Sequence, residues 1–177
     1  MLRKALILTW EKFQDHEVIY PYYALQEHGF EVTVAAGPSL GRIFGILGAH
    51  VGCDMLVEDL DVTLVDDYDL LVIPGGVKAL EKLRLEEKAV EFTSKWMSHN
   101  KMTLVICNGP QLLITAECLN GRECAGYYAI EQDIKNAGAV YNRYVCVDRN
   151  LISCSHYDFM GEWIRVGMEG FASYESN

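Results

Sequence analysis

The 177-residue chain lacks the segments that mark membrane and secreted proteins. No stretch approaches the roughly eighteen apolar residues that a membrane-spanning helix needs. The apolar run at residues 5–8 is also too short for the core of a signal peptide. We therefore expect a cytoplasmic protein with free thiols, because disulfides are rare in that compartment. The six cysteines follow no regular spacing and stand at positions 53, 107, 118, 124, 146 and 154.

Motifs for metals and nucleotides are missing too. No Cys-x-x-Cys pair occurs, so neither a zinc ribbon nor a thioredoxin-type site is indicated. The glycine-rich stretch 41–52 lacks the Lys-Ser/Thr ending of a P-loop, and its spacing differs from a dinucleotide-binding fingerprint. We expect no cofactor and no metal. A zinc site from Cys107, Cys154 and His156 is conceivable, but a Cys-x-His spacing is not specific for one.

A surplus of positive charge is absent as well. Lys and Arg number 15 against 25 Asp and Glu, which gives a net charge of −10 at pH 7. Such a chain repels phosphate groups, which argues against nucleic acid and anionic membranes as partners. We interpret the acidic excess as a solubility property.

The chain does contain an alternation of short apolar runs with helical patterns, and half of its residues are hydrophobic. Strands that are apolar throughout are typical of a parallel sheet with helices on both faces. We predict one α/β domain over residues 1–177, a three-layer sandwich of the flavodoxin-like type. Predicted strands cover residues 5–9, 31–36, 69–73, 103–106, 144–147 and 151–154, with short strands around Val51 and Val57; predicted helices cover 15–28, 86–99, 110–118, 131–137 and 158–171.

Cys107 stands where a predicted buried strand meets a predicted helix, the layout of a nucleophile elbow. The sharp turn would lift the thiol above the sheet, and the helix start would lower its pKa. The N–H groups of Asn108 and of the Gly75-Gly76 pair would form an oxyanion hole. The alternative is a buried structural cysteine at a strand end.

Several motifs around this cysteine resemble those of the ThiJ/PfpI superfamily. They are Val-Ile-Pro-Gly-Gly at 72–76 and Ile-Cys-Asn-Gly-Pro-Gln-Leu-Leu-Ile at 106–114, with supporting matches at 19–22, 119–122, 136–139 and 145–153. The resemblance covers residues 4–164 and implies the class I glutamine amidotransferase-like fold. Its PfpI branch, the "intracellular protease" branch, implies peptidase-like, glyoxalase-III-like or deglycase activity. It also implies a homodimer or a larger homo-oligomer, such as a hexamer.

The resemblance also implies roles for individual residues. It makes Cys107 the nucleophile and gives Gly76 and Asn108, next to Gly75, the oxyanion-hole positions. Glu81 matches a glutamate that reaches the active site of a neighbouring subunit. Two further positions match the surroundings of the cysteine: Tyr127 matches a tyrosine that lines the pocket, and Gly48, with Gly45, matches a glycine turn near it.

Three positions depart from the family's pattern. The usual Cys-His-Gly-Pro reads Cys-Asn-Gly-Pro here, so Asn108 replaces a histidine that could carry a proton. The usual Phe-Glu-Asp reads Phe-Gln-Asp, so we expect Gln14 to hold the sulfur through its amide without shuttling a proton. Where the family tends to show Ser-Arg-x-Pro, the chain has Ser155 and His156, which loses a positive charge and gains an imidazole.

Two functions follow, from different classes. The first is an enzyme that uses Cys107 without a cofactor on a small electrophilic carbonyl compound, with Asn108, Gln14, Glu81 and His156 as catalytic partners. His156 would then act as a replacement general base, unless it is merely a surface histidine. The second is a non-catalytic protein of the same fold that senses oxidants or binds a ligand, or is chaperone-like. A peptidase is not expected, because the Cys–His pair is broken at Asn108.

Overall fold

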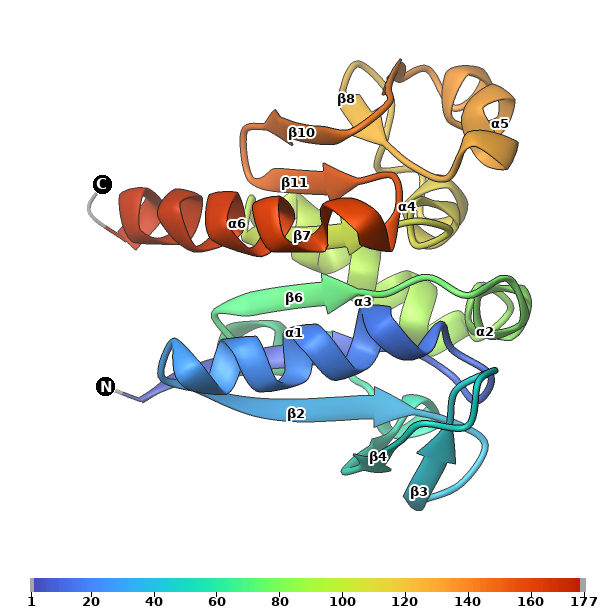
Figure 1. Cartoon of the computed structure of the whole chain (residues 1–177), viewed down its shortest axis with the longest axis vertical. Helices are drawn as coiled ribbons and strands as arrows, with labels where there is room; N and C mark the ends of the chain where they lie inside the picture. The colour runs from blue at the N-terminus through green and yellow to red at the C-terminus, as the bar shows by residue number, and fades with distance from the viewer. Residues whose placement is uncertain (1, 176–177) are drawn as a thin grey trace.

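A seven-stranded sheet forms the centre of the protein, as the computed structural model of residues 2–175 shows (Figure 1). The strand order is β10-β11-β7-β6-β1-β2-β5, and every neighbouring pair is parallel except β10 with β11. The strands of this sheet are β1 (Arg3–Leu8), β2 (Phe30–Ala36), β5 (Met55–Leu56), β6 (Leu70–Ile73), β7 (Met102–Ile106), β10 (Val145–Asp148) and β11 (Leu151–Cys154).

Helices cover both faces of the sheet. In Figure 1, α1 (Asp15–Glu27) and α6 (Met160–Glu175) lie in front of it, while α3 (Glu87–Ser98) and α4 (Pro110–Thr115) lie behind. This arrangement confirms the predicted three-layer α/β sandwich with a mainly parallel sheet. Two short helices complete the set, α2 (Val77–Leu83) and α5 (Glu131–Asn136). None of the helices among the described residues is both long and apolar enough to cross a membrane.

The central strands are buried along their whole length, which explains why they read as continuous apolar runs. Every residue of β6 and β7 is buried, and so are the last four of β1. One row of the ladder places Ile7 beside Val72, Val72 beside Leu104, and Leu104 beside Ile152. Burial of each such side chain contributes about 1.5–3 kcal/mol to folding.

The structure differs from the predicted elements at the edges of the sandwich. Helix α2 was not predicted, nor was the small parallel pair β8 (Glu123–Ala125) and β9 (Val140–Asn142). A hairpin of β3 (Gly41–Phe44) and β4 (His50–Cys53) lies near Val51 as expected. The short strand expected around Val57 is β5, which ends one residue before Val57, where a 3-10 turn begins. These pieces are short and half exposed, so hydrophobic periodicity carries little information about them.

Four neighbouring strands, β11, β7, β6 and β1, end at the same edge of the sheet. Ligands of open α/β sheets bind at the carboxyl ends of the strands. The segments that leave these four ends therefore contain the residues to examine: residues 9–17, 74–77, 107–110 and 155–158.

Candidate active site

Cys107 sits at a sharp turn directly after β7. Its φ angle is 59°, in the left-handed region that residues other than glycine rarely adopt. Its N–H donates to the Cys154 carbonyl and its own carbonyl accepts from the Tyr127 N–H, both at 2.8 Å. A Cβ at Gly109 would lie 2.5 Å from the Ile73 carbonyl oxygen, so the chain can turn this tightly only with glycine there. The elbow geometry expected from the sequence is present.

Backbone N–H groups converge on the sulfur from two strand ends. The N–H of Asn108 and the N–H of Gly76 both hydrogen-bond to Cys107 Sγ. The thiol also lies 3.4 Å from Asn108 Oδ1. Gly76 has a φ of 104°, and a Cβ there would lie 2.6 Å from the Gln14 nitrogen. Both N–H groups that were predicted to form an oxyanion hole therefore point at the sulfur.

The carboxyl of Glu17 occupies the place that the sequence analysis gave to Gln14. Glu17 is fully buried in the first turn of α1 and shares a hydrogen bond with the Cys107 thiol. Its Oε2 accepts from the Gly75 N–H at 2.8 Å, while the buried Oε1 has no hydrogen-bond partner among the described residues. Gln14 lies at the cavity instead, with its amide 3.4 Å from His16. An acid–base partner for the thiol is therefore present, and the expectation that an amide replaces it was wrong.

The space between these groups admits only glycine at position 75. A Cβ on Gly75 would lie 2.4 Å from Glu17 Oε2, 2.7 Å from the Cys107 Cβ and 2.9 Å from the Asn108 nitrogen. Gly75 therefore lets the carboxyl and the thiol meet. We call this cluster of Glu17, Gly75, Gly76, Cys107 and Asn108 the thiol site.

Burial changes the acidity of both ionisable groups of the thiol site. Loss of hydration raises the pKa of Glu17 to about 7, although the hydrogen bonds from Cys107 and Gly75 oppose this. Burial, and then the negative charge of Glu17, raise the pKa of the Cys107 thiol, against the two backbone N–H groups that lower it. The lowered thiol pKa expected from the sequence was wrong, because the neighbouring carboxyl and the burial outweigh the helix start. Near pH 7 Glu17 therefore gains and loses a proton, while Cys107 keeps its own and remains a thiol.

The thiol site opens into a cavity of about 320 Å³. Six of the predicted residues line it together: Gln14, Gly76, Cys107, Asn108, Tyr127 and His156. Sequence reasoning missed its other lining residues, which are Glu17, Ile46, Val77, Lys78 and Tyr157.

His156 enters the cavity as part of a row of stacked rings. Ring centroids are 3.9 Å apart between His156 and Tyr157, 6.2 Å between His156 and Tyr127, and 4.8 Å between Tyr157 and His16. Tyr128 extends the row, 4.4 Å from Tyr127. We call these five rings the aromatic stack. His156 Nδ1 accepts a hydrogen bond from the Asp158 N–H at 3.3 Å, with Asp158 Oδ2 3.1 Å away, so Asp158 orients the imidazole and leaves Nε2 as its second functional atom.

Gly48 lies on a loop that a buried carboxylate holds against the site. Asp15 accepts the Leu47 N–H at 2.8 Å and the Ala49 N–H at 2.7 Å. Gly48 has a φ of 97°, and a Cβ on Gly45 would collide with the Asp15 carboxyl. The loop reaches the cavity through Ile46 rather than through Gly48 itself.

Glu81 is exposed on α2 and forms an ion pair with Lys78 at 3.6 Å. Among the described residues, the lining of the Cys107 cavity includes Lys78 but not Glu81. Glu81 thus starts from the same short helix as two lining residues, yet its carboxylate lies on the outer surface of this chain.

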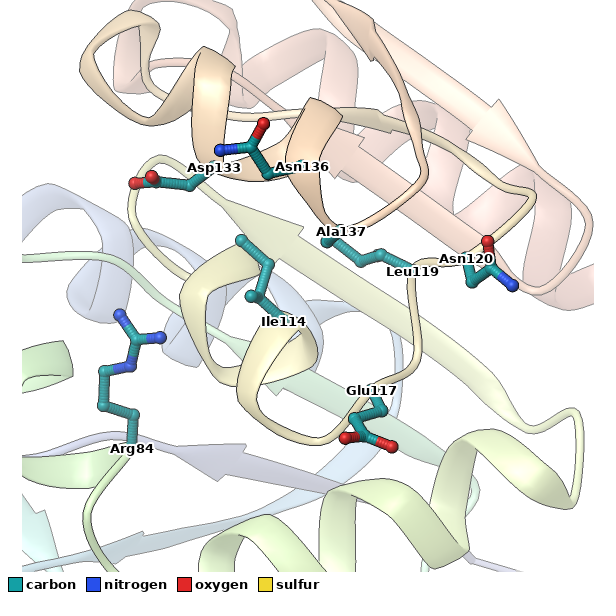
Figure 2. A pocket seen from close by; sticks show the side chains of 8 residues that line it. All are labelled: Arg84, Ile114, Glu117, Leu119, Asn120, Asp133, Asn136 and Ala137. Atoms are coloured by element: carbon teal, nitrogen blue, oxygen red, sulfur yellow. The ribbon is translucent and has the colours of Figure 1, made fainter.

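Three larger cavities among the described residues have no cysteine in their lining. Figure 2 shows one of about 600 Å³ between α4 and α5, where Arg84, Glu117 and Asp133 provide charges. Neither cysteine nor histidine lines it. Within residues 2–175 no group of three His, Cys, Asp or Glu side chains is spaced to hold a metal. Of the residues considered for a zinc site, Cys154 donates its thiol proton to the His156 carbonyl. The Cys107 cavity is the candidate active site.

Comparison with known proteins identifies the fold that carries this site. The sequence profile of the DJ-1/PfpI family matches residues 3–169. The chain belongs to the DJ-1/PfpI family. The family assignment agrees with the resemblance seen in the sequence motifs around Cys107.

Named relatives point the same way. The chain is 40% identical over 163 residues to a protein named deglycase PfpI from Pyrococcus furiosus, covering 92% of this chain and 95% of that one. It is 41% identical, over the same number of residues and with the same coverage, to a protein named as a deglycase from Thermococcus kodakarensis. The crystal structure of Drosophila melanogaster DJ-1beta superposes with a TM-score of 0.83 at 20% identity, covering 96% of this chain and 90% of that chain, which shows the shared fold.

Proposed function

We propose that the protein is a cysteine-dependent enzyme that acts without a cofactor on small electrophilic carbonyl compounds, α-oxoaldehydes in particular. The observation that carries the proposal is the convergence of a thiol, a carboxyl with a pKa of about 7 and two backbone N–H donors in one small cavity. The names of the deglycase relatives support the same class of chemistry.

The first step needs only groups of the thiol site. Glu17 as carboxylate takes the thiol proton while Cys107 Sγ bonds to the carbonyl carbon. The electron pair of the C=O bond moves to the oxygen, where the Gly76 and Asn108 N–H groups stabilise it. Glu17 then returns the proton to this oxygen and leaves a hemithioacetal. A carboxyl with a pKa near 7 is suited to both transfers, since it gains and loses a proton at neutral pH.

The later steps add one molecule of water. In an α-oxoaldehyde adduct, a proton leaves the former aldehyde carbon and another is delivered to the neighbouring carbon through an enediol, which converts the hemithioacetal into a thioester. Water hydrolyses the thioester and frees Cys107, so methylglyoxal and water give lactate. His156, oriented by Asp158 and lining the same cavity, is the second group available for these proton transfers.

Turnover of methylglyoxal to lactate tests the proposal. We expect Cys107→Ala to lose at least about a thousandfold in rate and Glu17→Gln about a hundredfold, the usual contribution of a general base. Cys118→Ala is the matched control, because this half-buried cysteine lies outside the cavity and should leave the rate unchanged. A chelator should have no effect if no metal takes part.

Two results would overturn the proposal. One is wild-type turnover no faster than buffer; the other is a Cys107→Ala variant as active as the wild type. Either would favour a redox-sensing, ligand-binding or chaperone-like protein of the same fold. His156→Gln decides a finer point: a loss as large as that of Glu17→Gln would make the imidazole an equal partner, and a small loss would leave Glu17 as the main base.

The proposal includes a homo-oligomer, as the family resemblance implies. Glu81 supports this, because its exposed carboxylate lies on the helix that begins at the cavity. Light scattering after gel filtration would give the mass. A monomer at micromolar concentration with full activity would contradict a role for Glu81 in a neighbouring site.

A further inference from the structure

A second cavity of about 290 Å³ adjoins the reactive one. Tyr127 and His156 line both, so these two rings form the wall between them. On the far side the lining is dominated by aromatic rings, with one charged side chain, Arg143. A substrate that reacts at Cys107 and extends past this wall would place its other end here.

Two rings of this second cavity are exposed to solvent instead of packing in the core. Tyr128 and Tyr144 are 68% and 59% exposed, far more than is usual for large aromatic side chains. Tyr144 packs edge-on against Phe159 with centroids 5.2 Å apart. Aromatic faces and edges in this arrangement favour a flat ring as ligand, through offset or edge-to-face stacking.

Arg143 supplies a positive charge that the protein leaves unused. Its guanidinium has no hydrogen bond or ion pair with a residue in the range 2–175. The residues that line the cavity include no Asp or Glu, so no carboxylate among them neutralises this charge. In a chain with a net charge of −10, an unpaired guanidinium beside an aromatic cavity attracts an anion, and its planar fork matches a carboxylate in particular.

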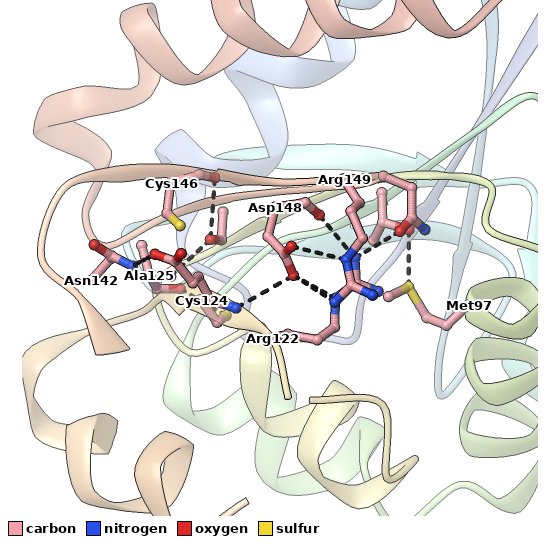
Figure 3. Close-up of polar contacts among 12 residues, drawn as sticks. Met97, Arg122, Cys124, Ala125, Asn142, Cys146, Asp148 and Arg149 are labelled. Carbon is pink, nitrogen blue, oxygen red and sulfur yellow. Dashed lines mark hydrogen bonds and ion pairs between the residues drawn. The ribbon is translucent and has the colours of Figure 1, made fainter. Parts of the chain in front are cut away.

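The walls of the cavity are anchored to the sheet. Figure 3 shows Arg122 reaching from the start of β8 to Asp148, with Nε 2.8 Å from Oδ2; its Nη2 also donates to Asn150 Oδ1 at 2.7 Å. The Ala125 N–H donates to Ser153 Oγ at 2.7 Å, and Tyr141 OH donates to the Gly126 carbonyl at 3.0 Å. The segments that carry the rings are thus held in place before a ligand arrives, which lowers the entropy cost of binding.

We propose that this second cavity binds an aromatic ring bearing a carboxylate, as the distal part of a substrate whose carbonyl group reacts at Cys107. The aromatic side chains stack against the ring of the ligand, and Arg143 binds its carboxylate. Within the proposed class of α-oxoaldehydes, the preferred substrates are therefore aromatic ones that carry a carboxylate. This inference rests on the proposed function for its catalytic part, but the binding part stands on the cavity alone.

The experiment combines turnover with direct binding. We expect kcat/KM of the wild type to be at least about tenfold higher for 4-carboxyphenylglyoxal than for methylglyoxal, measured as initial rates. Arg143→Gln should lower kcat/KM for 4-carboxyphenylglyoxal by about tenfold or more, the usual effect of losing a hydrogen bond to a charged group. It should leave kcat/KM for methylglyoxal unchanged. Arg165→Gln is the matched control, since this exposed arginine on α6 lies outside both cavities.

Titration with benzoate, followed by NMR or calorimetry, separates the two proposals. We expect benzoate to bind the wild type and the Arg165→Gln variant, and to bind Arg143→Gln at least about tenfold more weakly. We expect this binding pattern even if neither aldehyde is turned over. A lack of turnover would reject only the proposed reaction. Benzoate binding that Arg143→Gln leaves unchanged, or a loss of kcat/KM equal for both aldehydes, would overturn the subsite.

Discussion

The thiol site and the aromatic stack line the same cavity but are built in opposite ways. The thiol site consists of buried groups at the ends of central strands, where backbone N–H groups and one carboxyl meet around the sulfur. The aromatic stack consists of partly exposed rings from the segments after β8 and β11 and from the start of α1. The difference suggests a division of tasks, in which buried groups set the reaction and exposed rings select the substrate.

The comparison also concerns tolerance to change. At Gly75 and Gly76 there is no room for even one methyl group, whereas the rings of the stack border open space. Substitutions should therefore alter stability and activity together in the thiol site, and should alter substrate choice with little effect on stability in the aromatic stack.

Glu17→Gln should show the largest effect on stability. The pKa of Glu17 is about 7 in the folded protein against 4.5 for an unperturbed glutamate. Between these pH values the unfolded chain releases the proton and the folded chain keeps it, so rising pH destabilises the wild type. The variant has no such titration. Its unfolding free energy relative to the wild type should rise by roughly 2–3 kcal/mol between pH 5 and pH 8.

Chemical denaturation at both pH values measures this shift. Glu162→Gln, an exposed glutamate on α6, serves as the control and should show no comparable change. A Glu17→Gln variant whose advantage is the same at pH 5 and pH 8 would mean that the carboxyl is not buried beside the thiol, and the contrast between the two regions would fail.

Gly75→Ala should show the next largest effect. The new methyl group would overlap the Glu17 carboxyl and Cys107, so these groups must move apart. We expect a loss of about 1–3 kcal/mol in stability and of about a hundredfold in methylglyoxal turnover. Gly161→Ala is the matched control, because a Cβ there meets nothing within 4 Å, and a helical alanine should slightly raise the melting temperature.

Asp15→Asn tests the loop that borders both regions. The carboxylate accepts two backbone N–H groups of the loop, and an amide can replace at most one of these acceptors. We expect about 1–2 kcal/mol of destabilisation, visible as a lower melting temperature. Hydrogen exchange at Leu47 and Ala49 should also accelerate. Unchanged exchange at these two amides would show that the loop does not depend on Asp15.

Tyr128→Ala should have the smallest effect on stability. The ring is 68% exposed, so its removal should change the unfolding free energy by less than about 0.5 kcal/mol. Phe92→Ala, in a fully buried position, should cost about 3–5 kcal/mol in the same measurement. A large loss in Tyr128→Ala would show that the aromatic stack is structural, and would remove the distinction drawn between the two regions.

Much of the fold could be predicted from the sequence, because the central strands are buried on both faces. Residues 69–73 and 103–106 read as uninterrupted apolar runs for this reason, and they correspond to β6 and β7. Helix α2 was missed since it follows Gly76 directly and has only seven residues, too few for a clear helical period. The predicted elbow at Cys107 depended on a strand–helix junction that local sequence does reveal.

The partner of the thiol could not be read as easily. The match of Phe13-Gln14-Asp15 to the family's Phe-Glu-Asp placed Gln14 at the partner position. The carboxyl that reaches the sulfur belongs to Glu17, three residues later. One signal was available: Glu17 shares the buried face of α1 with Pro21 and Ala24, at helical spacings of four and seven. A glutamate on an apolar helix face is rarely buried without a partner. The pKa values depend on burial and on that contact, which spacing alone does not give.

The left-handed backbone of Cys107 bears on how the protein evolved. A side chain with a φ of 59° costs about 1–2 kcal/mol, and the buried Glu17 beside it costs more above pH 5. Glycine at the first position and glutamine at the second are each one base change away and would relieve these handicaps. A lineage with no use for the thiol would drift toward such relief, because most proteins sit close to their stability threshold. The presence of both features in one chain fits the proposed use of Cys107 as a nucleophile.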